Sequence, residues 1–348
     1  MSESHRVYSK QIGFSSRNKI FEKFDYNEYT PSAKYISRKI TFVRLGLSVS
    51  NFELNLMLSY WYPIVLMKNL FLPYLSFMRR GAEKVEAPIG KTPAIIHSGW
   101  ASGYYHWVTE TLPRAIILRD RFPDALPLIP LDVYGRYIAT LEAVGFQEVL
   151  PYPDNKNAVC DRIVLTDCPK IFGTTSPSLM CRVRKEVFKG LGINTADGAD
   201  FVYVSRSKSR GRKIANEDEI ISLVKRFGGE VINFEDYDFP SQVKLMSSCK
   251  VIVGIHGAGL TNMVFMPPGG TVIELLPVRN GLRDYRKIGN SFKHQACYWR
   301  LSEAMGHTHD FILGEPTTSW FQRTDMADVA ICRSDFKSAL IRSGLVER

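Results

Sequence analysis

Residues 250–276, KVIVGIHGAGLTNMVFMPPGGTVIELL, most constrain what this chain can fold into. The run 251–255 is short, apolar and rich in β-branched residues, which is typical of a buried strand. A turn with His256 and closely spaced glycines follows, then a short apolar segment with helical spacing, two prolines, and a second apolar run over 271–276. This order predicts a strand–turn–helix–strand unit. Its glycine-rich turn lies at the edge where doubly wound sheets bind ligands.

Length, charge and cysteine usage set the broad class. The 348 residues suffice for two domains or one large one, and 45% of them are hydrophobic. The net charge of +10 suits nucleic acid, an anionic membrane surface or phosphate-bearing ligands, and equally a basic surface without a specific partner. The six cysteines show no C-x-x-C spacing, and the N-terminus lacks the apolar region of a secretory signal. These features predict reduced thiols and a cytoplasmic location.

One apolar and aromatic stretch, 54–78, is followed by two arginines. Prolines at 63 and 73 and a Lys-Asn pair between them argue against a simple transmembrane helix. Two interpretations remain: packing within the core, or an interfacial segment with basic anchors. Peripheral membrane contact through 54–80 is the expectation from the second.

Strand and helix patterns alternate in two stretches of the chain. The first covers 92–168 and includes a helix over 104–122 with a kink or restart at Pro113. A further helix over 176–192 ends at a glycine, and a second alternating stretch begins at residue 201. The pattern predicts an α/β protein with parallel sheets.

A small, polar stretch over 193–200 is the predicted linker between two domains. We expect an N-terminal domain over 1–195, of which 1–90 show no clear periodicity, and a C-terminal domain over 196–348. Two consecutive βα domains predict a ligand cleft between them.

Four cations cluster after the predicted strand 201–204. Arg206 follows this strand at its carboxyl end, and Arg210, Arg212 and Lys213 follow in the loop before the next helix. Open α/β sheets bind ligands at this edge, and guanidinium groups bind phosphate oxygens through two parallel hydrogen bonds. The cluster predicts a clamp for a diphosphate; the alternative is a solvated basic loop.

The glycine-rich turn supplies a second set of candidate ligand contacts. Its glycines let a ligand approach the backbone, and the N–H groups at the start of the next helix can point at a phosphate. The predicted phosphate-binding residues of this turn are Gly257, Ala258, Gly259 and Leu260. His256 lies between the turn and the basic loop and is predicted to contact the ligand. Glu274, in an otherwise apolar strand, must have a partner, either ribose hydroxyls or backbone at the domain seam.

A third constellation lies in GYYHWVTETLPR, residues 103–114. His106, Glu110 and Arg114 are spaced four apart and share one face of a helix. A carboxylate one turn from an imidazole can orient it or can itself accept a proton from a hydroxyl, so either is a candidate catalytic base. The second His of a zinc protease motif is absent. Trp107 and Arg114 are predicted to line the acceptor side of the cleft; the alternative is an ion-paired surface stripe.

In this order and spacing, GYYHWVTETLPR, YVSRSKSRGRKIANEDE and VIVGIHGAGLTNMVFMPPGGTVIEL resemble glycosyltransferase family 61. That family includes plant xylosyl- and arabinosyltransferases, animal O-linked N-acetylglucosaminyltransferases and bacterial glycan enzymes. The resemblance covers 92–278, and HGAGLTN is its most specific part. It implies a GT-B-like fold, with two Rossmann-type domains facing across a cleft. It also implies inverting transfer from a nucleotide-diphospho-sugar, such as a UDP-sugar, to a hydroxyl of a glycan or glycoconjugate.

The resemblance further implies roles for the candidate residues. The basic loop would hold the diphosphate, Glu274 would face the ribose, and the His106–Glu110 pair on the acceptor side would supply the base. No metal or other cofactor is expected. Asp-Tyr-Asp at 236–238 has the spacing of a metal motif but is predicted to cap the following helix.

Two rival functions come from other classes. A nucleic-acid-binding protein with a Rossmann-like core fits the basic charge, but the cations cluster at strand ends rather than along a stripe with interleaved aromatic residues. Nucleic acid is therefore not an expected partner. A catalytically silent scaffold that binds nucleotide sugars is the second rival, and the presence of both His106 and Glu110 argues against it.

Overall fold

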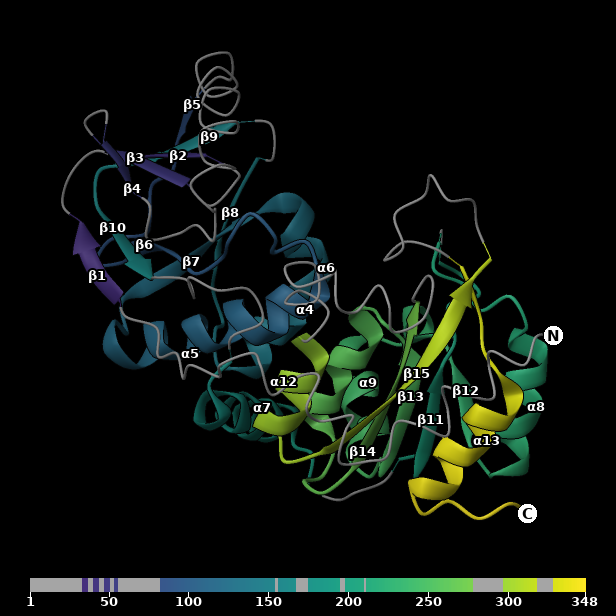
Figure 1. Cartoon of the computed structure of the whole chain (residues 1–348). Coiled ribbons are helices and arrows are strands. Elements are labelled where there is room, and N and C mark those ends of the chain that lie inside the picture. Colours follow the sequence, from purple (N-terminus) through teal and green to yellow (C-terminus); the bar gives the residue numbers. More distant parts are fainter. Residues whose placement is uncertain are drawn as a thin grey trace. The chain divides into compact units, whose positions relative to one another are not determined.

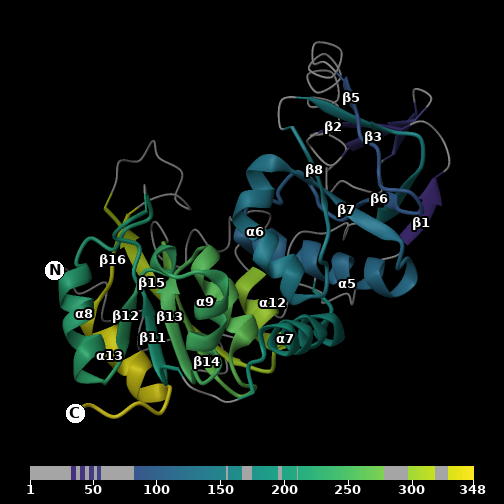
Figure 2. The same cartoon turned by 180° about the vertical axis from the view of Figure 1, so that it is seen from behind.

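The computed structural model describes eleven stretches of the chain: residues 33–36, 40–43, 47–50, 53–55, 82–153, 156–166, 175–194, 198–209, 211–277, 297–317 and 328–348. These residues belong to two compact units that divide after Asn194 (Figure 1, Figure 2). Each unit contains a sheet with parallel strands and flanking helices, so the protein is a mixed α/β protein.

The N-terminal unit contains two five-stranded sheets. In strand order, the first is β1 (Ala33–Ile36), β10 (Ile163–Thr166), β6 (Thr92–Ile95), β7 (Ala125–Pro130) and β8 (Leu150–Tyr152). Its four strands other than β1 run parallel, and helices connect β6 to β7 and β7 to β8. The second is β4 (Glu53–Asn55), β3 (Leu47–Ser50), β2 (Ile40–Val43), β9 (Asn157–Cys160) and β5 (Ala82–Lys84). Buried side chains of β9 join the core of the first sheet.

A nearly continuous helix carries the predicted acid–base pair of this unit. It consists of α4 (Tyr104–His106), the π-helical turn η2 (Trp107–Thr111) and α5 (Leu112–Arg121). The predicted kink or restart at Pro113 corresponds to the change from this π turn to α5 at Leu112, one residue before the proline. Proline has no N–H and its ring displaces the carbonyl one turn earlier, so the widened turn accommodates it.

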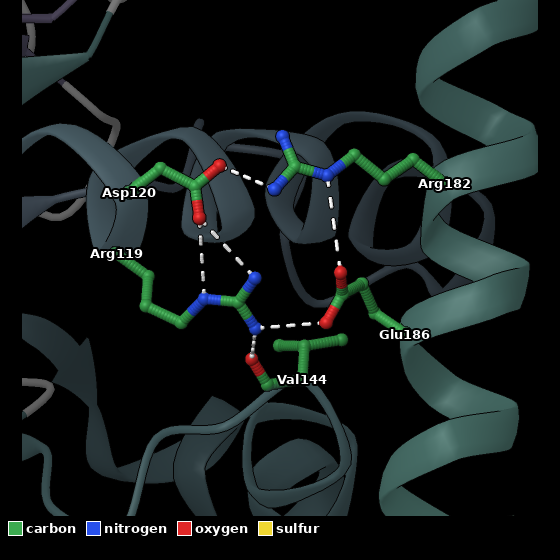
Figure 3. A network of polar contacts seen from close by, with 5 residues as sticks. All are labelled: Arg119, Asp120, Val144, Arg182 and Glu186. Carbon is green, nitrogen blue, oxygen red and sulfur yellow. Dashed lines mark hydrogen bonds and ion pairs between the residues drawn. The ribbon is translucent and has the colours of Figure 1, made fainter.

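Two further helices, α6 (Leu131–Ala143) and α7 (Pro177–Leu191), complete the unit, and an ion-pair network ties them to α5 (Figure 3). Arg119 donates to the carbonyl of Val144 at 2.6 Å and to Glu186 at 3.1 Å. Asp120 accepts from Arg119 and from Arg182. The network holds the far end of α5 against α7, about three turns away from the predicted acid–base pair, so it is part of the scaffold.

The C-terminal unit is built on one six-stranded sheet. In strand order it consists of β12 (Glu230–Ile232), β11 (Phe201–Val204), β13 (Val251–Ile255), β14 (Thr271–Pro277), β15 (Thr308–Pro316) and β16 (Val329–Ala330). All neighbours pair in parallel except β15 with β16. The buried strands carry near-continuous apolar residues, as expected for a parallel sheet covered on both faces.

Helices cover both faces of this sheet (Figure 1). On one face, α8 (Glu217–Arg226) and α13 (Arg333–Arg342) pack into a core with β11, β13, β14 and β15. The other face carries α9 (Phe239–Met246), the 3-10 helix η4 (Ala258–Phe265) and α12 (Cys297–Ala304). A short 3-10 helix, η3 (Phe234–Asp236), precedes α9. The pairing of β13 with β14 across η4 confirms the strand–turn–helix–strand unit predicted for 250–276.

The strand order fixes where ligands bind in such a sheet. In chain order the first five strands are arranged 2-1-3-4-5, so the winding direction reverses between β11 and β13. In sheets with this strand order, the loops after the two strands at the reversal leave in opposite directions, and ligands bind at the carboxyl ends of those strands. The loop after β11 begins with Ser205 and Arg206, and the turn after β13 begins with His256.

Several local predictions can be compared with the structure. The glycine cap at the end of the predicted helix 176–192 is confirmed, because Gly192 has φ of 65° and ends α7. Asp238 caps α9 by accepting from the N–H of Ser241 at 2.9 Å, as predicted for Asp-Tyr-Asp. The segment 54–80 lies outside the described residues except for the end of β4.

Candidate active site

The loop after β11 is folded around one hydroxyl group. The guanidinium of Arg206 donates from Nε and Nη2 to Ser209 Oγ, at 3.3 and 2.9 Å. Ser209 Oγ in turn donates to the carbonyl of Gly211 at 2.6 Å and accepts from its N–H. These bonds hold Arg206 at the carboxyl end of the sheet. Arg210 lies outside the described residues.

A second guanidinium reaches the same place from Arg212. Its Nη1 donates to the carbonyl of His256 at 2.9 Å, which links the basic loop to the glycine-rich turn. Arg212 has φ of 58°, in the left-handed region that non-glycine residues rarely adopt. Such strain is common at binding and catalytic sites, where the surroundings hold the backbone in place.

The two arginines place two positive charges at the carboxyl end of the sheet. Burial and the nearby charge of Arg212 lower the pKa of Arg206. Within the described part of the chain, neither guanidinium forms an ion pair with an acidic side chain. Two adjacent cations, one of them partly buried, are suited to an anion with several oxygens. Lys213 lies in the same loop, and its backbone N–H donates to the side chain of Asp328.

The two glycines of the turn serve different purposes. A Cβ on Gly257 would lie 2.2 Å from Arg206 Nη1, so the missing side chain makes room for the guanidinium. A Cβ on Gly259 would lie 2.8 Å from Val204 Cγ1 and 3.4 Å from the ring of Phe234, which are core side chains. The expectation that Gly259 makes room for ligand is therefore corrected, since its lack of a side chain serves packing.

The helix after the turn also differs from the prediction. A 3-10 helix begins at Ala258, two residues before the predicted helix start. Leu260 is buried, and its N–H donates to the carbonyl of Gly257 at 3.0 Å. Leu260 is thus engaged inside the turn, which corrects its predicted role as a phosphate donor. The first N–H groups of a helix have no intrahelical acceptor, so those of Ala258 and Gly259 are the remaining candidates.

Glu274 on β14 binds two histidines. Its Oε1 is 2.5 Å from His256 Nδ1, and its Oε2 is 3.0 Å from His309 Nε2 on β15. The residue is fully buried, so burial by itself would raise the pKa of its carboxyl. The charge of His256 and the hydrogen bonds from both rings outweigh burial and hold that pKa below its usual range. Both oxygens are occupied away from solvent, which corrects the prediction that Glu274 faces a ribose.

Tyr298 on α12 completes the surroundings of His256. The two rings lie edge to face, with centroids 5.0 Å apart and planes at 74°. Burial raises the pKa of the Tyr298 hydroxyl well above its ordinary value, so it stays neutral. Sequence analysis missed Tyr298 and His309. A lone Tyr in a helix and a lone His in a strand carry no local signal of a site.

The N-terminal unit brings together the predicted acid–base pair. His106 Nδ1 is 2.6 Å from Glu110 Oε1, and Ser98 Oγ donates to Glu110 Oε2 at 3.5 Å. Glu110 is buried, whereas the side chain of His106 is 14% exposed. Trp100 stacks on the imidazole with ring centroids 5.9 Å apart, and about half of Trp100 is exposed. Ser98 and Trp100 were missed because they lie in the loop after β6 and become neighbours of the helix only in the folded unit.

Two predicted cleft residues of this unit are core residues instead. Trp107 is fully buried, donates to Thr140 Oγ1 at 2.7 Å and stacks on Tyr137. Arg114 is also fully buried and donates to the hydroxyl and carbonyl of Thr166, at 2.8 and 2.9 Å. The π turn takes an extra residue, so Arg114 does not continue the face of the His106–Glu110 pair. The prediction that both line an acceptor cleft is wrong.

Comparison with known proteins identifies the family. A family model described as Glycosyltransferase 61 matches residues 104–273, which contain the acid–base pair, the basic loop and the glycine-rich turn. The segment 104–273 belongs to glycosyltransferase family 61. This confirms the resemblance carried by the three sequence motifs. His309 lies beyond the matched residues.

Relatives of this family 61 chain are glycosyltransferases from plants and animals. An alpha-1,3-arabinosyltransferase of rice, Oryza sativa subsp. japonica, is 41% identical over 73 residues, covering 20% of this chain and 13% of the relative. A protein O-linked-mannose beta-1,4-N-acetylglucosaminyltransferase 2 of Xenopus laevis is 36% identical over 124 residues, covering 35% and 20%. The human protein of that name is 35% identical over 83 residues, covering 23% and 14%. The matches thus span a fifth or less of these relatives' own length.

The relatives correct the predicted cytoplasmic location. The plant and animal enzymes matched here are lumenal enzymes of the Golgi or endoplasmic reticulum. The prediction failed because it used the lack of a signal-like segment and of paired cysteines as evidence of compartment. Among the helices of the described stretches, none has the length and apolar character needed to cross a membrane.

The acidic residues near the site do not form a metal centre within the described residues. Asp238 caps α9, and Asp236 forms an ion pair with Lys208. No group of three or more His, Cys, Asp or Glu side chains in those residues is placed to hold a metal ion.

Proposed function

We propose that this protein is an inverting glycosyltransferase. It transfers a sugar from a nucleotide-diphospho-sugar to a hydroxyl of a glycan or glycoconjugate. The observation that carries the proposal is the convergence of Arg206, Arg212 and His256 at the switch point between β11 and β13. Family membership supports sugar transfer, and this cationic site supports a donor with a diphosphate.

The leaving group determines what the donor site must do. When the glycosidic bond to the diphosphate breaks, its electron pair goes to a phosphate oxygen, and negative charge grows there. Arg206 and Arg212 stabilise this charge, with amide groups at the start of η4 and the outer N–H of a protonated His256 as further donors. These groups do the work for which other transferases use a metal ion, so we propose metal-independent transfer.

The acceptor hydroxyl must lose its proton as its oxygen attacks the anomeric carbon from the side opposite to the diphosphate. We propose His106 as the base, because it is the more exposed partner of the pair. Glu110 is then a positioning residue, which accepts the N–H from His106 Nδ1 and directs Nε2 outward. The proton passes from the acceptor hydroxyl to the imidazole, so charge is balanced in the step.

Trp100 is the proposed contact for the acceptor sugar. One face of its indole stacks on His106, and about half of the side chain is exposed. Aromatic faces bind the apolar C–H face of a sugar ring while the sugar hydroxyls stay in water. Trp100 therefore takes the place that the sequence had assigned to Trp107.

A GT-B-like arrangement, in which donor and acceptor units face each other across a cleft, is also part of the proposal, as is uridine as the base of the nucleotide. The two α/β units support the arrangement because each carries a parallel sheet of the Rossmann kind. Uridine rests on the family resemblance alone.

A donor screen tests the proposal. Thermal shift and calorimetry with UDP, GDP and CMP sugars are compared among the wild type, Arg206→Met and Lys208→Met. Lys208 is a matched control, since it is an exposed cation of the same loop that is already paired with Asp236. A nucleotide at 100 times its Kd should stabilise the wild type and Lys208→Met by about 2.7 kcal/mol, and Arg206→Met much less.

Two outcomes would contradict the proposal. Equal nucleotide binding by wild type and Arg206→Met would show that the positive site is not the donor site. Nucleotide binding without any hydrolysis or transfer, over a range of acceptors, would favour the non-catalytic scaffold.

A further inference from the structure

A chain of three ionisable side chains runs from the donor site into the core of the C-terminal unit. His256 is at the outer end with its side chain 15% exposed, Glu274 is fully buried in the middle, and His309 is at the inner end with its side chain 2% exposed. The proposed function uses only His256. The purpose of the inner two residues is therefore open.

The hydrogen bonds among these three side chains define the tautomer of His256. The pKa of the Glu274 carboxyl is held below its usual range, so the group is ionised at neutral pH and can only accept hydrogen bonds. His256 must then donate from Nδ1 and His309 from Nε2. Among the described residues, Nε2 of His256 has no hydrogen-bond partner. It is the ring nitrogen left to meet a ligand beside Arg212.

His309 restricts the one torsion that could undo this arrangement. The terminal torsion of a Glu side chain is broad, so a carboxylate held at one oxygen can rotate. Glu274 is held at both oxygens, and the second bond comes from β15, the strand that pairs in parallel with β14. The plane of the carboxylate, and with it the ring of His256, is thus set by a residue on the neighbouring strand.

We propose that His309 is a positioning residue for the donor site, which acts through Glu274 to hold the Nδ1–H of His256 on the carboxylate and leave Nε2 on the outer side, where a proton taken up with the ligand lets it donate to a diphosphate oxygen. The inference rests on the proposed function for the identity of the ligand. The orientation of His256 itself can be measured without any ligand.

A matched pair of substitutions separates positioning from simple filling of the core. In His309→Gln the amide nitrogen reaches the place of Nε2 and can still donate to Glu274. In His309→Asn the side chain is one methylene shorter, so its amide cannot reach Glu274. The seven histidines are labelled with nitrogen-15, the His256 signals are assigned with a His256→Gln sample, and the tautomer is read by NMR. UDP affinity is measured by calorimetry, and melting temperature is recorded for each variant.

The expected result is a split between the two variants. His309→Gln should keep the Nδ1–H tautomer and bind UDP within about 2-fold of the wild type. His309→Asn should show a mixture of tautomers and bind UDP about 10-fold more weakly, since the loss of an aligned hydrogen bond to a charged group is of this order. If His309 only fills space in the core, its substitution should lower the melting temperature and leave the His256 tautomer and the UDP affinity unchanged.

Three results would overturn the inference. One is an unchanged His256 tautomer in His309→Asn, and another is an equal loss of UDP affinity in both variants. The third is an Nε2–H tautomer of His256 in the wild-type protein. This measurement decides the question even if His309→Asn does not fold. If UDP does not bind the wild type at all, the proposed donor fails, while the tautomer comparison still decides whether His309 positions His256.

Discussion

The substitution Gly257→Ala tests the donor site through its geometry rather than by removing a charge. A Cβ at this position would lie 2.2 Å from Arg206 Nη1, whereas ordinary contacts begin at 3.4 Å. The guanidinium must therefore retreat by about 1.2 Å or more. The backbone itself is not strained, because φ at Gly257 is 171°, a value that any residue adopts. Only the end of a flexible side chain has to move.

Gly257→Ala should weaken UDP binding and leave the free energy of unfolding nearly unchanged. Loss of a charge-assisted hydrogen bond from Arg206 to the diphosphate costs about 1.5–3 kcal/mol, which is about 10- to 150-fold in UDP affinity. The free energy of unfolding should change by less than about 0.5 kcal/mol. Calorimetry with UDP and urea denaturation measure the two quantities on the same samples.

Two other glycines supply controls for the added methyl group. In Gly135→Ala, on the exposed side of α6, the new Cβ meets nothing within 4 Å, so affinity should be unchanged and stability slightly higher. In Gly259→Ala the new Cβ presses on Val204, so stability should fall by about 1–3 kcal/mol. The reasoning is refuted if Gly257→Ala binds UDP as tightly as the wild type, or if it loses as much stability as Gly259→Ala.

Four further predictions concern catalysis and pH. His106→Ala should lower kcat by roughly 10²–10⁴-fold and Glu110→Gln by less, both with UDP affinity nearly unchanged, since the proposed donor site is in the other unit; full activity of both variants in steady-state assays would exclude the His106–Glu110 pair. Transfer should persist in excess EDTA, and strict dependence on added Mn²⁺ or Mg²⁺ would reject the cationic clamp. Trp100→Ala should raise the acceptor KM without changing donor affinity, and an unchanged acceptor KM would remove it from the acceptor site. Burial and the charge of Arg114 lower the pKa of His97 from 6.5 to about 3, so native His97 takes up no proton where the unfolded chain does. Stability should therefore fall as the pH drops below 6.5, by up to about 5 kcal/mol near pH 3, and urea denaturation of His97→Gln should show a shallower fall; an identical pH dependence would contradict this.

The predictions that succeeded depend on residues close together in the chain. The strand–turn–helix–strand order of 250–276 follows from the period of apolar residues and the position of glycine and proline. Asp238 caps α9 through an N–H three residues later, and His106 meets Glu110 one turn away. Each arrangement is set by backbone geometry over a few residues, which the sequence displays directly.

The predictions that failed depend on which elements pack together. Gly257 and Gly259 look alike in sequence, yet one faces the guanidinium of Arg206 and the other faces the core side chain of Val204. Trp107 follows directly after His106, but the π turn and the contact with α6 bury it. A helical pattern does not specify which neighbour covers a given face.

Sequence alone was sufficient for the α/β class, the family and the edge of the sheet where cations gather, because periodicity and motif order carry that information. Tertiary structure decided the partners of buried charges. Glu274 had to have a partner, and the sequence required one without naming it. One partner is His256, and the other is His309, 35 residues further along, because β15 pairs in parallel with β14 and brings that ring to the second carboxylate oxygen. Strand pairing between distant segments is a property of the folded sheet, so no local pattern could have shown it.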